Sequence, residues 1–196
     1  MARKWSNQNL PGALHFVTGN LLDRIPIFRR DDCCESFLKV LGDLLRDWPC
    51  KLIAYVLMPD HIHMIVNPQD GRIREFMGKL KGVSARSIVE ITGGANFKKE
   101  SDDGSEHQVW QQSFKAQALW STWMIWQKIH YIHANPVKAR LVASAKDYPW
   151  SSFRAFYSDS GEPLPVDHDW WWPDDSKKLS QAVKALGWRS WEKRNC

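Results

Sequence analysis

The spacing of apolar residues changes along the chain, and each change predicts a different element. Leu14 to Asn20 alternates between apolar and polar positions, which is typical of a half-buried strand. From Asp31 to Trp48 the apolar residues recur at helical spacing, and acidic residues at the start suit the positive end of a helix dipole. Lys51 to Leu57 and His61 to Val66 are again strand-like runs. Since only Met58-Pro59-Asp60 separates these two runs, we expect an antiparallel hairpin.

The next pattern predicts a second layer of helices. A basic helix is expected from about Ile73 to Ile91, ended by Gly93-Gly94. Asn96 to Gln108 is polar and charged, which indicates a mobile loop. Val109 to Phe114 favours a fourth strand, and Ala116 to Asn135 a long helix that ends at the Asn135-Pro136 pair.

The tail after Leu141 is rich in loop-forming residues. Tyr148 to Ser152 and Trp170 to Pro173 predict irregular packing segments, and Ser176 to Leu186 predicts a last helix. Strands interleaved with helices around a central hairpin indicate an α+β fold. The order fits a ferredoxin-like β-α-β-β-α-β sandwich, with a central antiparallel sheet and helices packed on it.

Composition narrows the class of protein. With 196 residues, 43% of them hydrophobic and 25% charged, the chain is long enough for one globular domain, with or without an appendage. No apolar run approaches the roughly 18 residues that span a membrane. The polar N-terminus lacks a secretory signal, so we expect a cytoplasmic protein with no membrane partner. The four cysteines form no Cys-x-x-Cys pair, which excludes a zinc ribbon and indicates reduced thiols.

Positive charge is concentrated in one segment. Between residues 72 and 99, seven basic residues face two acidic ones, a surplus equal to the net charge of +5 of the whole chain. Such a segment suits a polyanion such as nucleic acid, although a solvated helix face explains it equally well. The basic residues are Arg72, Arg74, Lys79, Lys81, Arg86, Lys98 and Lys99.

Two histidines are the strongest chemical signal. On a strand, His61 and His63 point to the same side, while Ile62, Met64 and Val66 point to the other. Two neighbouring imidazoles can share one divalent metal ion if a third ligand comes from elsewhere. Without that third ligand, a His-x-His pair on a strand is more often structural.

The predicted helix before Pro136 offers the missing groups. Residues three and four apart share a helix face, so Gln127, Lys128, Tyr131 and Asn135 form one polar strip, opposite Trp126, Ile129 and His133. Asn135 could offer its carbonyl oxygen to a metal held by the two histidines. Tyr131, one turn away, could then attack a phosphate bound to that metal. Because a phenol is a poor nucleophile at neutral pH, it needs such help.

Twelve tryptophans are a high count for this length. Tryptophan stacks on unpaired bases, but it more often packs in a core. The three at Trp120, Trp123 and Trp126 are expected to pack. Trp110, beside Gln111 and Gln112, is the better candidate for contact with DNA.

Several motifs in this order resemble the single-tyrosine His-hydrophobe-His transposases, specifically the REP-associated tyrosine transposases of bacteria. The resemblance covers roughly residues 10 to 157. It is carried by residues 58–66 (MPDHIHMIV), 76–82 (FMGKLKG), 109–111 (VWQ), 131–139 (YIHANPVKA) and 147–152 (DYPWSS).

The resemblance implies a catalytic domain over residues 1–157 and a C-terminal extension over residues 158–196. It implies that Tyr131 attacks a phosphodiester in single-stranded DNA that folds into hairpins, leaving a 5′-phosphotyrosine link and a free 3′-hydroxyl. His61 and His63 match the family's metal-binding histidines, and Asn135 matches the third ligand, where related insertion-sequence transposases carry glutamine. The chain departs from its relatives in the Trp-rich stretch from Trp120 to Trp126 and after Tyr157.

The sequence therefore predicts a Mg²⁺- or Mn²⁺-dependent single-strand DNA endonuclease and strand transferase, active as a monomer or homodimer on REP-like hairpins. Zinc is less favoured, because zinc hydrolases usually bring three protein ligands and a water. Two alternatives stay open, a hairpin-binding protein without activity and a metal hydrolase acting on small phosphoesters. The expected contacts to DNA are Lys79, Lys81, Arg86, Lys98, Lys99, Trp110 and Lys128.

Overall fold

Four antiparallel strands form the central sheet of the protein. The computed structural model describes residues 12–94, 97–101, 104–119, 121–158 and 163–168. The elements, in chain order, are β1 (Leu14–Asn20), α1 (Asp31–Asp47), β2 (Cys50–Met58), β3 (His61–Pro68), α2 (Ile73–Thr92), β4 (Lys98–Ser101), β5 (Gly104–His107), β6 (Lys115–Leu119), α3 (Thr122–Lys138) and α4 (Phe153–Ser158), with short 3-10 turns at Leu22–Arg24, Ile27–Arg29 and Ala145–Asp147.

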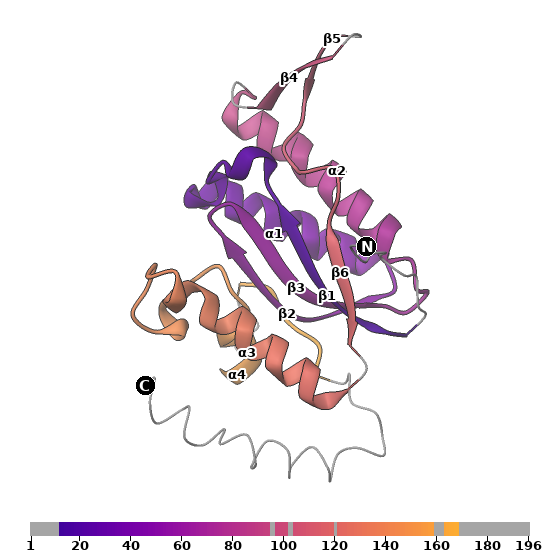
Figure 1. Ribbon diagram of the computed structural model, residues 1–196, viewed down its shortest axis with the longest axis vertical. Coiled ribbons are helices and arrows are strands. Elements are labelled where there is room, and N and C mark those ends of the chain that lie inside the picture. Colours follow the sequence, from indigo (N-terminus) through magenta and orange to yellow (C-terminus); the bar gives the residue numbers. More distant parts are fainter. Residues whose placement is uncertain (1–11, 95–96, 102–103, 120, 159–162, 169–196) are drawn as a thin grey trace, which may run out of the picture.

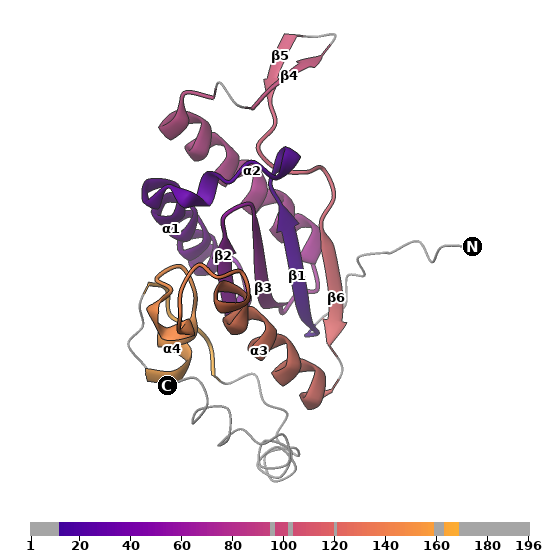
Figure 2. The same ribbon diagram turned by 60° about the vertical axis from the view of Figure 1, so that its left-hand side comes forward.

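The strand order confirms the expected ferredoxin-like topology. The sheet runs β2-β3-β1-β6, and β4 and β5 pair separately. The expected hairpin is present, because Met58 pairs with His61 across the Pro59-Asp60 turn. Helices α1 and α2 lie on one face of the sheet and α3 on the other, as Figures 1 and 2 show.

Two separate cores hold these layers together. Val17, Ile62 and Met64 pack with apolar residues of α1 and α2 on one face. Ile65 and its neighbours pack with Ile129 of α3 on the other. Full burial of one such aliphatic side chain contributes about 1.5–3 kcal/mol to folding. Side chains alternate between the two faces of a strand. Because Ile62 and Met64 point toward α1 and α2, His61 and His63 point toward α3.

The edge strand β2 is covered by segments from the end of the described chain. The backbone N–H of Leu57 donates to the carbonyl of Trp150 at 2.8 Å, and that of Asp167 donates to the carbonyl of Leu52 at 2.6 Å. The Asp167 carboxylate accepts a return bond from the Leu52 N–H at 2.8 Å. These bonds use backbone groups of β2 that an edge strand otherwise leaves open to another chain.

Three expectations for the middle of the chain are wrong. Within the expected loop at 96–108, β4 and β5 form a hairpin that projects beyond the end of α2 in Figure 1. The last strand of the sheet is not Val109 to Phe114 but β6, and the long helix begins at Thr122, not at Ala116. Ala116 to Leu119 favours a helix locally, yet it pairs with β1 instead. Ser121 then caps α3, accepting a bond from the Met124 N–H at 3.3 Å.

The end of α3 also differs from expectation. The helix continues through the buried Pro136 to Lys138. The turn that follows is closed by backbone bonds from Ala139 to the Asn135 carbonyl and from Leu141 to the Pro136 carbonyl, both 2.9 Å. Tertiary packing of the proline ring thus outweighs the local tendency to end the helix. As a result Lys138 stays on the same helix as Tyr131.

The remaining expectations concern thiols, membranes and the tail. Cys33 and Cys34 are buried free thiols, and burial raises the pKa of Cys33 to about 11, so neither is a nucleophile. Within the described ranges, no helix has both the length and the apolar character to cross a bilayer. The segments expected at Trp170 to Pro173 and at Ser176 to Leu186 lie outside the described residues.

Candidate active site between the sheet and helix α3

The two histidines lie side by side on the α3 face of the sheet. His63 is paired with Thr18 of β1, and His61 with Asn20. The centres of the two imidazole rings are 4.8 Å apart, with the rings nearly perpendicular. A strand thus presents both rings to one point in space, as the His-x-His spacing predicts.

His63 is buried, and its ring is held at one edge and on one face. Its Nδ1 lies 2.9 Å from the Thr18 hydroxyl, and the ring stacks on Phe16 with centroids 5.3 Å apart. Burial, aided by the nearby positive charge of His61, Lys128 and Arg24, lowers the pKa of His63 to about 3. The imidazole is therefore neutral at physiological pH, which is the form that binds a metal ion.

His61 is oriented by a carboxylate in the preceding turn. Its Nδ1 lies 2.5 Å from Asp60 Oδ1, and the other oxygen of Asp60 accepts a bond from Arg24 at 3.2 Å. Burial opposes ionisation of Asp60, but the bonds and charges of His61 and Arg24 hold its pKa below the usual value. An ionised carboxylate at Nδ1 fixes the proton there. The lone pair of Nε2 is then directed outward, as in metal sites with a carboxylate behind the histidine.

The turn that carries Asp60 is itself fixed by neighbouring backbone. The Leu21 N–H donates to the Asp60 carbonyl at 2.9 Å, and the Phe28 N–H donates to the Pro59 carbonyl at 3.0 Å. Asp23 and Arg24, between these two donors, both have positive φ angles, of 49° and 57°. Such backbone is costly for non-glycine residues and persists only where surrounding contacts hold it. The contacts with the Pro59-Asp60 turn thus hold this segment in its strained conformation.

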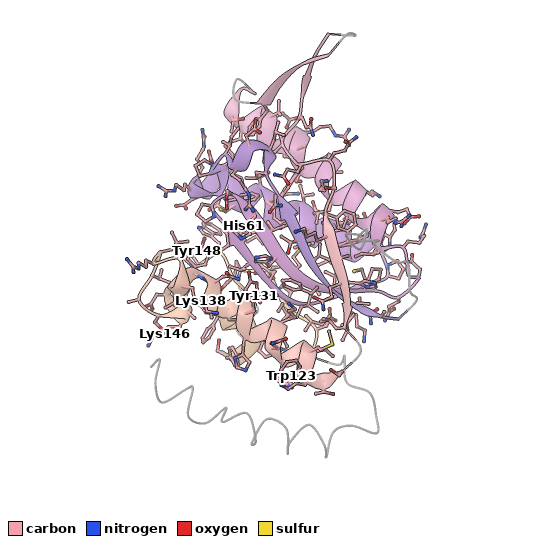
Figure 3. All side chains as sticks on the ribbon, viewed as in Figure 1. His61, Trp123, Tyr131, Lys138, Lys146 and Tyr148 are labelled. Atoms are coloured by element: carbon pink, nitrogen blue, oxygen red, sulfur yellow. The ribbon has the colours of Figure 1, made fainter. Side chains whose placement is uncertain are left out.

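Tyr131 of α3 faces the histidines. Its hydroxyl is 3.4 Å from Nε2 of His63, and its ring meets Phe16 edge-on with centroids 5.8 Å apart. The side chain is 37% exposed, while Ile129 and Ile132 on either side are fully buried. The helix is therefore anchored by its apolar face, and the partly exposed phenol lies between α3 and the sheet (Figure 3).

Two lysines of α3 flank the phenol. The Lys128 ammonium lies 4.5 Å from the centre of the Phe16 ring and 5.8 Å from that of Tyr131. The Lys138 ammonium lies 5.7 Å from the Tyr131 ring centre. Positive charge on both sides of a phenol favours the approach of a phosphate to its hydroxyl. The sequence reasoning named Lys128 and missed Lys138, because the helix was expected to end before it.

Asn135 lies one turn after Tyr131 on α3. Its Nδ2 donates to the Tyr131 carbonyl at 3.0 Å, so the amide oxygen is the atom that could bind a cation. Among the described residues, no three His, Cys, Asp or Glu side chains gather closely enough to hold a metal ion. Two imidazoles with anchored Nδ1 atoms and one amide oxygen are nonetheless donors that suit a divalent ion with open positions.

The other expected DNA contacts do not join this site. Lys79, Lys81 and Arg86 belong to α2, on the opposite face of the sheet. The Lys81 ammonium donates to the carbonyls of residues 111 and 112 at 2.6 and 3.0 Å, so this lysine fixes a loop. Lys98 and Lys99 lie on β4, in the projecting hairpin.

Trp110 is a core residue, which corrects the expectation of base stacking. It is 4% exposed and packs against Phe28 and Phe37. Its indole N–H donates to Ser84 Oγ at 3.1 Å. Both the ring faces and the polar tip are therefore used within the fold.

Three further residues at the site escaped sequence reasoning. Thr18 and Lys115 lie in one row with His63 across three strands, and only the strand register reveals this. Asp60 directly precedes His61, so its carboxylate could have been noticed as a partner for the imidazole. Its role was hidden because Pro59-Asp60 is also an ordinary turn signal.

The chain is similar to known transposases in sequence. A family model described as "Transposase IS200 like" matches residues 13–135, from just before β1 to Asn135. A Haemophilus influenzae protein assigned to the REP-associated tyrosine transposases is 29% identical over 146 residues, covering 72% of this chain and 80% of the relative. The REP-associated tyrosine transposase of Escherichia coli K12 is 27% identical over 182 residues, covering 90% of this chain and 94% of the relative.

One solved structure shares the fold. It is a REP-associated tyrosine transposase bound to a REP hairpin, with a TM-score of 0.62 and 22% sequence identity, covering 79% of this chain and 84% of that chain. The similarity confirms the α+β architecture and its layering of helices on an antiparallel sheet.

Proposed function

This chain belongs to the IS200-like transposase family, and we propose that it is a metal-dependent endonuclease and strand transferase for single-stranded DNA. The observation that carries the proposal is the approach of the Tyr131 hydroxyl to within 3.4 Å of His63 Nε2. A nucleophile from the helix layer thereby meets a ligand pair from the sheet. A hydrolase for small phosphoesters would not need the phenol at this position.

His61, His63 and the amide oxygen of Asn135 would hold the divalent ion, which we propose to be Mg²⁺ or Mn²⁺. When bound, such an ion polarises the scissile phosphate and stabilises charge on the leaving oxygen. Asp60 and Thr18 support the ion indirectly, since each holds the Nδ1 atom of one histidine and leaves Nε2 to act as ligand.

Cleavage proceeds by transesterification on Tyr131. The phenolic oxygen forms a bond to phosphorus as the bond from phosphorus to the 3′ oxygen breaks. The phenol proton passes, directly or through solvent, to the leaving oxygen, which becomes a free 3′-hydroxyl. The part of the strand that lies 3′ of the cut stays attached to the protein through its 5′-phosphate as a phosphotyrosine. A later attack by a 3′-hydroxyl on this link transfers the strand and releases the phenol of Tyr131. The energy of the original bond is retained, so no cofactor is consumed.

The expected substrate is single-stranded DNA next to a hairpin. The solved relative of the same fold is described as bound to a REP hairpin, and both sequence relatives carry the REP-associated name. Lys79, Arg86, Lys98 and Lys99 are assigned to the backbone of the hairpin stem, away from the phenol. Lys128 is assigned to the strand that is cut. Their contribution should weaken as salt increases.

The test is cleavage of a labelled strand with Mn²⁺. A panel of DNA hairpins with unpaired flanks, cut only in the presence of metal and leaving 3′-hydroxyl ends, supports the proposal. Tight hairpin binding without cleavage by any divalent metal would instead support the alternative, a catalytically silent hairpin-binding protein. Turnover of a small phosphoester by a Tyr131→Phe variant would support the hydrolase.

A further inference from the structure

Trp123 is the most exposed large apolar side chain among the described residues. It is 52% exposed, whereas Trp126, one turn further along α3, is 7% exposed and packs against Phe156. The contact between α3 and the sheet is made by Ile125, Ile129 and Ile132, each fully buried. The indole of Trp123 is therefore not needed to attach α3 to the sheet.

Trp123 begins a stripe of exposed side chains that leads to the proposed nucleophile. Residues four apart lie on the same side of a helix, so Trp123, Gln127 and Tyr131 follow one another along α3, and Lys138 continues the line two turns later. All four are exposed. Figure 3 shows Trp123 at one end of the helix and Tyr131 and Lys138 toward the other. We call these four residues the α3 stripe.

We infer that the α3 stripe binds the unpaired DNA strand beside the cleavage site, with Trp123 stacking on a base. The inference rests on the proposed function and deepens it. Lys128 and Lys138, whose ammonium groups lie 5.8 and 5.7 Å from the Tyr131 ring centre, hold the phosphates next to the one that is attacked. Trp123 then fixes a base further along the same strand.

The chemistry of the stripe fits a nucleic acid strand. Helix α3 contains no Asp or Glu, so no fixed negative charge on it repels a phosphate backbone. The stripe offers an exposed indole face and the ammonium group of Lys138, and the ammonium group of Lys128 lies beside it. Aromatic rings combined with positive charge bind single strands without strict sequence preference. Lys115 of β6 adds a further exposed cation on the same face of the sheet as His63.

The experiment measures binding of a single strand without cleavage. The full chain is titrated in EDTA with a fluorescent thymidylate of about 12 nucleotides, a length within the range of a single-strand site. Loss of one base-stacking contact should weaken binding by Trp123→Ala about 5- to 100-fold. Trp123→Phe, which keeps a ring, should recover most of the affinity. A strand carrying 5-iodouracil should also photocrosslink to Trp123.

A matched control and a second substrate make the result decisive. Leu141→Ala removes another exposed apolar side chain, 37% exposed, and should leave the affinity unchanged. A blunt duplex of the same length should bind Trp123→Ala and the parent chain equally. Equal loss on duplex and single strand, or no loss on the single strand, overturns the inference, as does a parent chain that prefers the duplex.

Failure of this inference is distinct from failure of the proposed function. If Tyr131 forms a covalent adduct with DNA while Trp123→Ala binds thymidylate normally, only the stacking role is lost. If Trp123→Ala weakens binding but no adduct ever forms, the strand-binding role of the α3 stripe stands and the cleavage proposal fails.

Discussion

The hydroxyl of Tyr131 lies 3.4 Å from Nε2 of His63, a contact between residues 68 positions apart in the chain. The distance exceeds that of a well-formed hydrogen bond, so the phenol is loosely held and free to turn toward a substrate. Contacts of catalytic groups are often long before substrate binds and tighten in the complex. The fold thus keeps the proposed nucleophile beside the proposed ligands without locking it there.

Asp60 should control metal affinity although it is not expected to touch the metal. Replacing it with alanine removes the acceptor that holds Nδ1 of His61, and losses of such partners typically reduce metal affinity 10- to 100-fold. We therefore expect weaker Mn²⁺ binding by Asp60→Ala, measured by electron paramagnetic resonance of free Mn²⁺. Nitrogen NMR of the imidazoles should also show a less defined Nδ1–H tautomer at His61.

The control for Asp60 is an exposed carboxylate on the far side of the sheet. Asp43 of α1 pairs only with Lys39 and Arg46 in the contacts described, and its replacement by alanine should leave Mn²⁺ affinity unchanged. Equal affinity of Asp60→Ala and the parent chain would remove Asp60 from the metal site.

Lys128 and Lys138 should each contribute one phosphate contact. Replacing either with alanine should weaken binding of single-stranded DNA and reduce the slope of log affinity against log salt by about 0.7, the value for one phosphate contact to a single strand. Lys39→Ala provides the comparison, because Lys39 lies on α1, on the opposite face of the sheet, and is 77% exposed. An unchanged salt slope in Lys138→Ala would show that this lysine does not contact the DNA backbone.

Acid should destabilise the fold through a second buried histidine. His133 is fully buried 2.9 Å from Ser152 Oγ, and burial, with the charge of His130, lowers its pKa to about 3. Between that value and the ordinary value near 6.5, the unfolded state binds a proton that the folded state does not. Stability therefore rises with pH across this window and is lost as pH falls below about 6.5.

Urea unfolding at two pH values measures this effect. The His133 contribution should lower the free energy of unfolding by about 1–2 kcal/mol between pH 7 and pH 5. A His133→Gln variant, compared at the same two pH values, should show a smaller pH dependence even if it is less stable throughout. An identical pH dependence in both proteins would exclude His133 as the source.

Sequence patterns predicted most of the fold because the strands are strongly patterned. β1 begins and ends at the predicted residues. The alternation of side chains along a strand also predicts correctly that His61 and His63 point to the same face of the sheet. The errors fall at Ala116 to Leu119, where good helix-forming residues pair with β1, and at Pro136, whose burial keeps the helix intact. In both places tertiary contacts outweigh local preference.

The site was only partly accessible to sequence reasoning. Tyr131, Lys128 and Asn135 were predicted correctly to share one face of α3, because helical spacing alone brings them together. Thr18 depends on strand register, and Lys138 on the true end of the helix, neither of which the pattern determines. Trp123 was expected to pack and Trp110 to contact DNA, yet the structure buries Trp110 and exposes Trp123, because sequence spacing does not show which indole lies in the core.

The central claim is that Tyr131 becomes covalently joined to DNA, and a denaturing gel tests it most directly. The full chain is incubated with Mn²⁺ and hairpin DNAs that have unpaired flanks. Each DNA is labelled 3′ of the candidate cleavage site, on the fragment whose 5′-phosphate becomes linked to the protein. We predict a labelled adduct whose nucleotide maps by mass spectrometry to Tyr131, absent with EDTA and absent in Tyr131→Phe, which still binds the same hairpin. Cleavage of the hairpin by Tyr131→Phe at the parent rate, or an adduct on another residue, would contradict the account.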